Sequence, residues 1–132
     1  MPRITEAERR KHRIYVALGE LASEMNYIAE AAIVEGPNDA KTLKLLGYKK
    51  PILLCSKRPY IELVELIARE HSNVVILTDF DEQGIVIHKR LSKLFEEWGV
   101  KVDRFYRKRF RTLLKGARIS TIEGIYSIKF DF

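Results

Sequence analysis

The sequence predicts an α/β fold: a three-layer sandwich with a mainly parallel sheet of about four strands and an additional N-terminal helix. Two observations support this prediction. Short apolar runs rich in β-branched residues alternate along the chain with longer segments of helical periodicity. Polar residues with Gly or Pro separate these segments. Strands that alternate with helices are joined by right-handed crossovers, so the sheet is expected to be parallel and covered on both faces.

The composition of the 132-residue chain is typical of a soluble globular protein, with 46% hydrophobic and 32% charged residues. No apolar run approaches the length of a membrane span, and the charged N-terminus does not resemble a signal peptide. The single cysteine, Cys55, lies in an apolar run, which predicts a buried thiol and a cytoplasmic location. The net charge of +6 indicates either an acidic partner or a charge that only aids solubility.

Residues 5–26 are predicted to form an amphipathic helix. Thr5 and Glu8 match a capping box, and apolar residues recur on one face as far as Met25. The chain is therefore expected to consist of an N-terminal helix packed on the domain (residues 1–27), a central domain (28–110), and a basic C-terminal helix and tail (111–132).

The remaining elements follow from apolar periodicity and from the positions of Gly and Pro. Strands are predicted at about 29–35, 51–56, 74–77 and 100–106, and helices at about 37–46, 60–71 and 83–98. The buried faces of the last two helices are expected to include Ile61, Val64, Ile67, Ala68 and Trp98. The alternating residues 125–130 predict an edge strand or a docking segment.

Acidic residues follow two of the predicted strands. Glu35 ends the first strand, and Asp79 and Asp81 follow the third. The carboxyl ends of parallel strands share one edge of the sheet, so these acids converge if the first and third strands are neighbours. Close carboxylates repel one another, and a hard divalent cation such as Mg²⁺ relieves that repulsion. Asp39 also lies near, where it could simply complement a helix N-terminus.

Basic residues follow the second strand and dominate the chain after residue 100, where aromatic residues are interleaved with them. Clustered cations with aromatic residues are typical of nucleic-acid contact, although cations in loops and on helices are often merely solvated. The candidate contacts are Lys57, Arg58, Arg104, Arg107, Lys108, Arg109 and Arg111.

Two other interpretations of the acids are open. Helix caps and solvated turns explain any one acid, but they do not explain three acids that project from buried strands to one edge. A phosphatase with an aspartyl nucleophile also uses an Asp-x-Asp motif. That motif normally follows the first strand, whereas Asp79 and Asp81 follow the third. A metal site therefore explains the acids better.

Two stretches carry a family resemblance. Ile33-Val34-Glu35-Gly36-Pro37-Asn38-Asp39 and Leu77-Thr78-Asp79-Phe80-Asp81-Glu82-Gln83-Gly84 resemble the two signature motifs of the Toprim domain. Topoisomerases, bacterial-type primases, old-family nucleases and small ribonucleases share this domain. The resemblance spans residues 28–110, and the size is similar to that of small, stand-alone, primase-like Toprim proteins of archaea and bacteria. It implies a Rossmann-like fold.

The resemblance also implies roles for particular residues. Glu35 would be a metal ligand and a general acid or base, Asp79 would bridge two Mg²⁺ sites, and Asp81 would bind the second metal. Asp39 matches the second acid of the first motif and is a weaker candidate. The expected cofactor is Mg²⁺, two ions per subunit, with Mn²⁺ as a substitute. The turns would be held by Gly36 and Gly84.

These observations lead to two functional hypotheses. The first is a Mg²⁺-dependent enzyme of phosphodiester chemistry, more specifically a nuclease acting on RNA or DNA, since no nucleotide-selecting machinery is visible. The alternative is a non-catalytic nucleic-acid or ribonucleoprotein binding module that retains the metal site. The sequence lacks the catalytic-tyrosine, zinc-ribbon and ATPase domains of the larger families. We expect nucleic acid as the partner, no membrane contact, and a monomer or homodimer.

Overall fold

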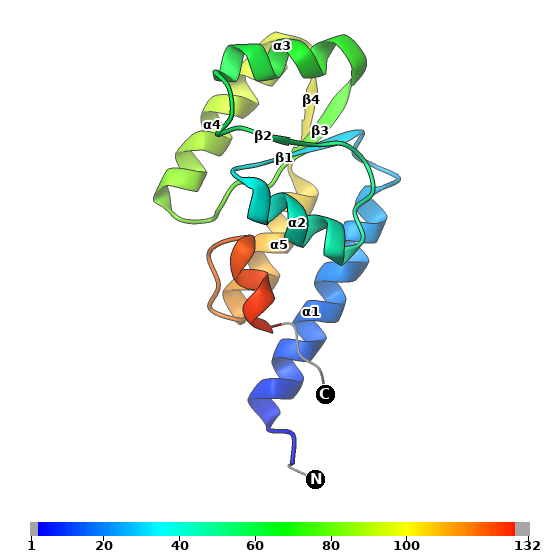
Figure 1. Cartoon of the computed structure of the whole chain (residues 1–132), viewed down its shortest axis with the longest axis vertical. Helices are drawn as coiled ribbons and strands as arrows, with labels where there is room; N and C mark the ends of the chain where they lie inside the picture. The colour runs from blue at the N-terminus through cyan, green and yellow to red at the C-terminus, as the bar shows by residue number, and fades with distance from the viewer. Residues whose placement is uncertain (1–2, 129–132) are drawn as a thin grey trace.

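The computed structural model describes residues 3–128 and confirms the α/β fold with its N-terminal helix (Figure 1). Four strands form one all-parallel sheet in the order β2-β1-β3-β4. The strands are β1 (Ala31–Val34), β2 (Ile52–Leu54), β3 (Asn73–Ile76) and β4 (Lys101–Asp103). The helices are α1 (Glu6–Met25), α2 (Pro37–Leu46), α3 (Tyr60–Glu70), α4 (Glu82–Glu97), α5 (Phe105–Gly116) and a short 3₁₀ helix, η1 (Glu123–Ile128).

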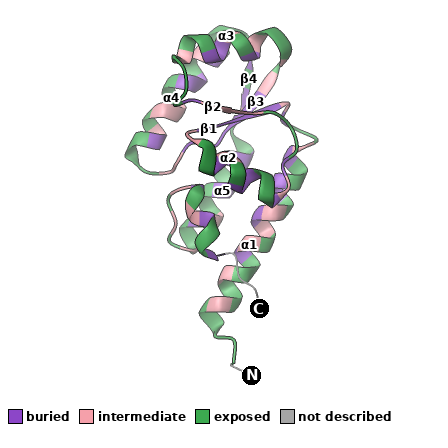
Figure 2. Cartoon of the chain, viewed as in Figure 1, coloured by how far each residue is buried: buried purple, intermediate pink, exposed green. Residues whose placement is uncertain are grey.

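Alternate residues of the two central strands point into separate cores. Ala32 and Val34 of β1 join a core formed with α1, α2, α5 and η1, whereas Ala31 and Ile33 join a core formed with α3 and α4. Both faces of the sheet are therefore covered by helices, and the central strands β1 and β3 are largely buried while the outer helix surfaces are exposed (Figure 2). This explains why β1 and β3 are nearly continuous apolar runs.

The strand order changes direction at β1, because β2 lies on one side of β1 while β3 and β4 lie on the other. Helix α2 leads from β1 to β2 on one face, and α3 and α4 lead to β3 and β4 on the other. The carboxyl ends of β1 and β3 therefore flank a topological switch point, where open α/β sheets bind their ligands. The adjacency of the first and third strands, on which convergence of the acids depends, is present.

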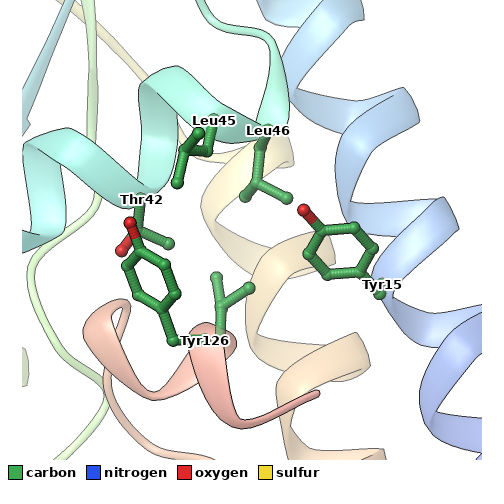
Figure 3. A pocket seen from close by; sticks show the side chains of 6 residues that line it. Tyr15, Thr42, Leu45, Leu46 and Tyr126 are labelled. Atoms are coloured by element: carbon green, nitrogen blue, oxygen red, sulfur yellow. The ribbon is translucent and has the colours of Figure 1, made fainter. Parts of the chain in front are cut away.

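The N-terminal helix has the capping box that the sequence predicts. The Thr5 hydroxyl accepts a hydrogen bond from the Glu8 amide at 3.1 Å, and the Glu8 carboxylate accepts one from the Thr5 amide at 2.9 Å. Helix η1 packs against α1 and α2 at a small pocket between Tyr15, Leu46 and Tyr126 (Figure 3). With a volume of about 10 Å³ this pocket has room for one water molecule at most, and it reflects packing.

Several local predictions were wrong. All four strands are short, and the predicted fourth strand ends at Asp103 because α5 begins at Phe105. Trp98 follows α4 as its C-cap and is 47% exposed, and Ile61 of α3 is 49% exposed. Residues 125–128 belong to η1 and form no strand, while residues 129–130 lie outside the described residues. The predicted division at residues 27 and 110 stays a proposal.

Candidate functional site

Glu35 and Asp79 meet at the switch point. Glu35 directly follows β1, and Asp79 lies three residues after the end of β3, so both are at the carboxyl edge of the sheet. The Glu35 carboxylate (Oε2) accepts a hydrogen bond from the Asp79 amide at 2.7 Å. The structure therefore brings together the acids of the two sequence motifs, which are separated by 44 residues along the chain.

The electrostatics of this pair follow from burial and from like charge. Burial raises the pKa of Asp79, and the neighbouring Glu35 and Asp81 carboxylates raise it further, to about 6. The hydrogen bond from the Ile122 amide acts in the opposite direction on this pKa. A carboxyl group in this position is stabilised by any cation that neutralises the excess negative charge.

Asp81 is the N-cap of α4. Its side chain (Oδ1) accepts a hydrogen bond from the Gly84 amide at 2.8 Å. Gly84 lies inside the first turn of α4, in a place that only glycine fits, because a Cβ atom there would lie 1.9 Å from the Asp79 carbonyl oxygen. Gly36, by contrast, has an extended φ of −142°, so its role in the turn does not depend on a left-handed backbone.

Asp39 is buried and uses both carboxylate oxygens in hydrogen bonds to backbone amides. Oδ2 accepts from Gly36 at 3.0 Å, and Oδ1 accepts from Glu123 at 3.1 Å. Burial and the nearby Asp79 raise the pKa of Asp39. These contacts give Asp39 a structural task, because it ties the turn after β1 to the C-terminal segment.

The C-terminal segment, residues 119–128, covers this edge of the sheet. The Ser120 carbonyl accepts a hydrogen bond from the Phe80 amide at 2.6 Å, and the Ile122 amide donates to Asp79 Oδ1 at 3.0 Å. Ile122 and Ile125 are buried in the core shared with α1 and α2. The segment therefore belongs to the site, although no sequence motif marks it.

The donor set suits a hard divalent cation in its chemistry. Glu35, Asp79 and Asp81 each bond a backbone amide through one oxygen, which leaves a second carboxylate oxygen to accept another ligand. Within residues 3–128, no three His, Cys, Asp or Glu side chains stand close enough together to hold a metal as they are. A cation bound by all three acids would therefore require their side chains to draw together.

Arg107 does not lie where the sequence predicts it. It is only 8% exposed and donates hydrogen bonds to the carbonyl oxygens of Ile76, Thr78 and Asp79 at 2.9 to 3.2 Å. Its guanidinium lies 4.6 Å from the centre of the Phe80 ring. Burial lowers the pKa of Arg107 to about 10, so it stays charged at neutral pH. We therefore reassign Arg107 from nucleic-acid contact to support of the acidic loop.

The other predicted nucleic-acid contacts lie on the surface. Lys57 and Arg58 follow β2 at the same edge as the acids, and Arg104 is paired with Glu96 at 2.5 Å. The remaining three lie on the exposed side of α5, and they are Lys108, Arg109 and Arg111.

The predicted burial of Cys55 is confirmed. It lies directly after β2, at the same edge of the sheet as Glu35. Burial and the charge of Glu35 raise the pKa of the thiol to about 11. The thiol therefore stays protonated at neutral pH and is a poor nucleophile.

Sequence reasoning missed two features of the site. The first is Thr78, fully buried, whose hydroxyl donates to the Gly84 carbonyl at 2.7 Å and so fixes the start of α4 against the loop. The second is the C-terminal segment. Position within the second motif could have indicated Thr78, but the segment carries no signal in the sequence because its contacts use backbone amides.

The chain is similar in sequence to known proteins. The Toprim domain family model matches residues 30–113. The chain belongs to the Toprim domain family. It is 39% identical over 98 residues to a UPF0292 protein of Pyrococcus abyssi, covering 74% of this chain and 73% of the relative. It is 34% identical over 119 residues to a UPF0292 protein of Methanosarcina barkeri, covering 90% and 82%.

The fold of this Toprim protein also matches a solved structure. A protein from Aquifex aeolicus superposes with a TM-score of 0.67 and 27% identity, covering 81% of this chain and 94% of that one. Toprim domains generally bind divalent metal ions such as Mg²⁺ and act in nucleic-acid metabolism. In the described part of the chain, none of the helices combines the length and the apolar character of a membrane span.

Proposed function

We propose that this Toprim protein is a Mg²⁺-dependent nuclease that cleaves phosphodiester bonds in RNA or DNA. The observation that carries the proposal is the contact of Glu35 with Asp79 at the switch point, where burial and like charge raise the pKa of Asp79 to about 6. Perturbed pKa values of carboxyl groups cluster at functional sites. A cytoplasmic location, suggested by the single Cys55, belongs to the same proposal.

Each residue of the site has a task in this mechanism. Glu35, Asp79 and Asp81 would hold the Mg²⁺ ions, with Mn²⁺ as a substitute. The metal, when bound, supplies Lewis-acid polarisation of the phosphate and activation of water. Glu35 is the candidate general acid or base. Arg107 holds the carbonyl groups of Ile76, Thr78 and Asp79 in place, so that the acids project from a fixed loop.

The test combines metal binding with cleavage. Mg²⁺ and Mn²⁺ are titrated into the wild type and Asp79→Asn by calorimetry, and cleavage of labelled structured RNA and single-stranded DNA is followed in parallel. We expect the wild type to bind metal and cleave one polymer, and Asp79→Asn to lose at least about 100-fold in rate. EDTA should abolish cleavage.

The matched control is Glu30→Gln. Glu30 precedes β1 at the opposite edge of the sheet, where its carboxylate accepts a hydrogen bond from the Ser72 hydroxyl. This substitution should leave both metal binding and cleavage unchanged. Equal losses in the two variants would contradict the assignment of the site to the edge that carries Glu35 and Asp79.

A second candidate function has one specific observation in its favour. The carboxylates of Asp79 and Asp39 already accept hydrogen bonds from amides of the C-terminal segment. A nucleic-acid or ribonucleoprotein binding module that performs no chemistry would fit this arrangement. Such a module predicts oligonucleotide binding without product at any Mg²⁺ or Mn²⁺ concentration, with an affinity that falls steeply as salt rises.

A further inference from the structure

A separate pocket lies beside the acidic edge, at the C-terminal end of α5. Its volume is about 370 Å³, which lies in the range of small-molecule sites. Its lining combines three cations with an aromatic ring and a short stretch of the C-terminal segment, namely Arg111, Lys115, Arg118, Phe80, Ile119 and Ser120. We call this the basic pocket.

The cations of the basic pocket have no acidic partner within the described residues. The ion pairs in that part of the chain join Arg13 to Glu6, Arg69 to Glu65, His71 to Glu30 and Arg104 to Glu96. Arg111, Lys115 and Arg118 take part in none of them. Three unneutralised cations around one recess attract an anion, and the guanidinium group of arginine matches the geometry of a phosphate group with two parallel hydrogen bonds.

Arg118 occupies a backbone position that favours glycine. Its φ is +59°, and it follows Ala117, the C-cap of α5, where its amide donates to the Lys115 carbonyl at 3.1 Å. The Ile119 amide donates to the Leu114 carbonyl at 2.9 Å, which completes a Schellman motif with Arg118 at the usual glycine position. Backbone strain of this kind clusters at active sites and ligand-binding sites.

A simpler explanation covers only part of the pocket. Lys115 lies in the last turn of α5, where a cation complements the helix dipole. Neither the retention of Arg118 in a left-handed conformation nor the recess between the three cations follows from that effect.

The basic pocket adjoins the acidic site through shared residues. Phe80 lines the pocket and directly follows Asp79 along the chain. The Phe80 amide donates to the Ser120 carbonyl at 2.6 Å, so the pocket wall and the acidic loop are joined. Two residues beyond Ser120, the Ile122 amide donates to Asp79. A strand held in the pocket is therefore next to the candidate metal ligands.

We propose that the basic pocket binds a phosphate group of the nucleic-acid strand, with Arg111, Lys115 and Arg118 as donors, and so presents the neighbouring phosphodiester to Glu35 and Asp79. This assignment rests on the proposed nucleic-acid function and adds a site for the substrate to it. The phosphate is either a terminal phosphomonoester or an internal phosphodiester of the strand, and the same donors suit both.

The decisive variant is Arg118→Gly. Glycine suits the left-handed backbone, so this substitution removes the guanidinium without a folding cost. Binding of a labelled single-stranded oligonucleotide is measured by fluorescence anisotropy in EDTA over a range of salt concentrations. We expect affinity to fall about 5-fold and the slope of log affinity against log salt to flatten by about 0.7, the value for one lost phosphate contact on a single strand.

Two controls accompany this variant. Lys93→Gln removes an exposed cation from α4, on the other face of the sheet, and should bind like the wild type. A thermal melt of Arg118→Gly should match or exceed that of the wild type, so weak binding cannot be ascribed to misfolding. The double variant Arg111→Gln/Lys115→Gln should weaken binding further than Arg118→Gly.

Oligonucleotides with a 5′-phosphate, a 3′-phosphate or no terminal phosphate show whether the pocket binds a terminal phosphomonoester or an internal phosphodiester. A preference for one terminal phosphate that Arg118→Gly abolishes supports the pocket and identifies a phosphomonoester. An equal loss on all three supports it and identifies an internal phosphodiester. Binding of Arg118→Gly and of the double variant that equals the wild type at every salt concentration would overturn the proposal, as would a wild type that binds no oligonucleotide.

Because binding is measured in EDTA and cleavage requires Mg²⁺, the two experiments test the pocket assignment and the proposed nuclease activity independently. If Arg118→Gly binds more weakly but the wild type cleaves nothing with Mg²⁺, the pocket assignment stands and the nuclease proposal fails. If the wild type cleaves and both pocket variants bind normally, the nuclease proposal stands and the pocket assignment is wrong.

Discussion

The pKa of an acidic residue is shifted in opposite directions at the two edges of the sheet, for Glu30 at the amino edge and for Asp79 at the carboxyl edge. At the amino edge, the Glu30 carboxylate accepts a hydrogen bond from the Ser72 hydroxyl at 2.5 Å and lies 3.5 Å from His71. These donors, Ser72 first, lower the pKa of Glu30. At the carboxyl edge, burial and two neighbouring carboxylates raise the pKa of Asp79 to about 6. Hydrogen bonds outweigh burial at Glu30, whereas at Asp79 burial and like charge outweigh the hydrogen bond from the Ile122 amide and leave an excess negative charge that a cation can neutralise.

The largest expected effect tests how tightly each edge is packed. Gly84→Ala at the carboxyl edge would place a Cβ atom 1.9 Å from the Asp79 carbonyl oxygen. We expect the free energy of unfolding to fall by about 3 kcal/mol or more, measured by urea denaturation. Gly99 at the amino edge has a φ of +78°, but a Cβ atom there would meet open space. Gly99→Ala should therefore lower the free energy of unfolding by only about 1 kcal/mol. Equal costs would contradict the close packing of α4 on the acidic loop.

A second test removes the support of the acidic loop. Arg107→Met keeps the apolar stem but leaves the carbonyl groups of Ile76, Thr78 and Asp79 without their buried donor. We expect a loss of about 2 kcal/mol in the free energy of unfolding. Arg104→Met, which removes an exposed ion pair with Glu96 and a long hydrogen bond of 3.5 Å to the Val102 carbonyl, should cost less than about 1 kcal/mol. If Arg104→Met proved the more harmful, Arg107 would not be the support we assign.

The smallest effect concerns the pH dependence of stability without metal. The folded protein raises the pKa of Asp79 from 3.8 to about 6, so it holds this proton more tightly than the unfolded chain does. The stability contributed by protonated Asp79 is therefore present at low pH and is lost as pH rises from about 4 to about 6. Asp79→Asn should be more stable than the wild type at pH 7, by about 1 kcal/mol after allowance for solvent screening.

Glu30→Gln should have the opposite effect on stability and be less stable than the wild type at pH 7. Because the fold lowers the pKa of Glu30, its contribution is present above the unfolded pKa of 4.5 and is lost as pH falls. Thermal melts from pH 3.5 to pH 8 in EDTA compare both variants with the wild type. Mg²⁺ should then stabilise the wild type and leave Asp79→Asn unchanged. The same sign in both variants would remove the contrast between the edges.

The sequence was sufficient to predict the layers of the fold and the meeting of Glu35 with Asp79, whereas the gathering of all three acids around a metal stays a prediction. The apolar strand runs and the glycine and proline positions determine where the elements fall, and β1 and β3 then bring Glu35 to Asp79. Trp98 was misassigned because helical periodicity continues one residue past the end of α4. Arg107 was misassigned because a basic run does not show which arginine turns inward to bind carbonyl groups.

The amides of residues 122 and 123 donate hydrogen bonds to Asp79 and Asp39, so a truncated form of the protein must include these residues to keep both acids in place. The family model ends at residue 113, yet the acids within it depend on amides beyond that limit. A fragment trimmed to the recognisable domain would leave Asp79 and Asp39 without two of their donors. The segment matched by the family model is thus smaller than the set of residues that holds these acids in place, and changes at residues 122 and 123 can alter the site without replacing any acid.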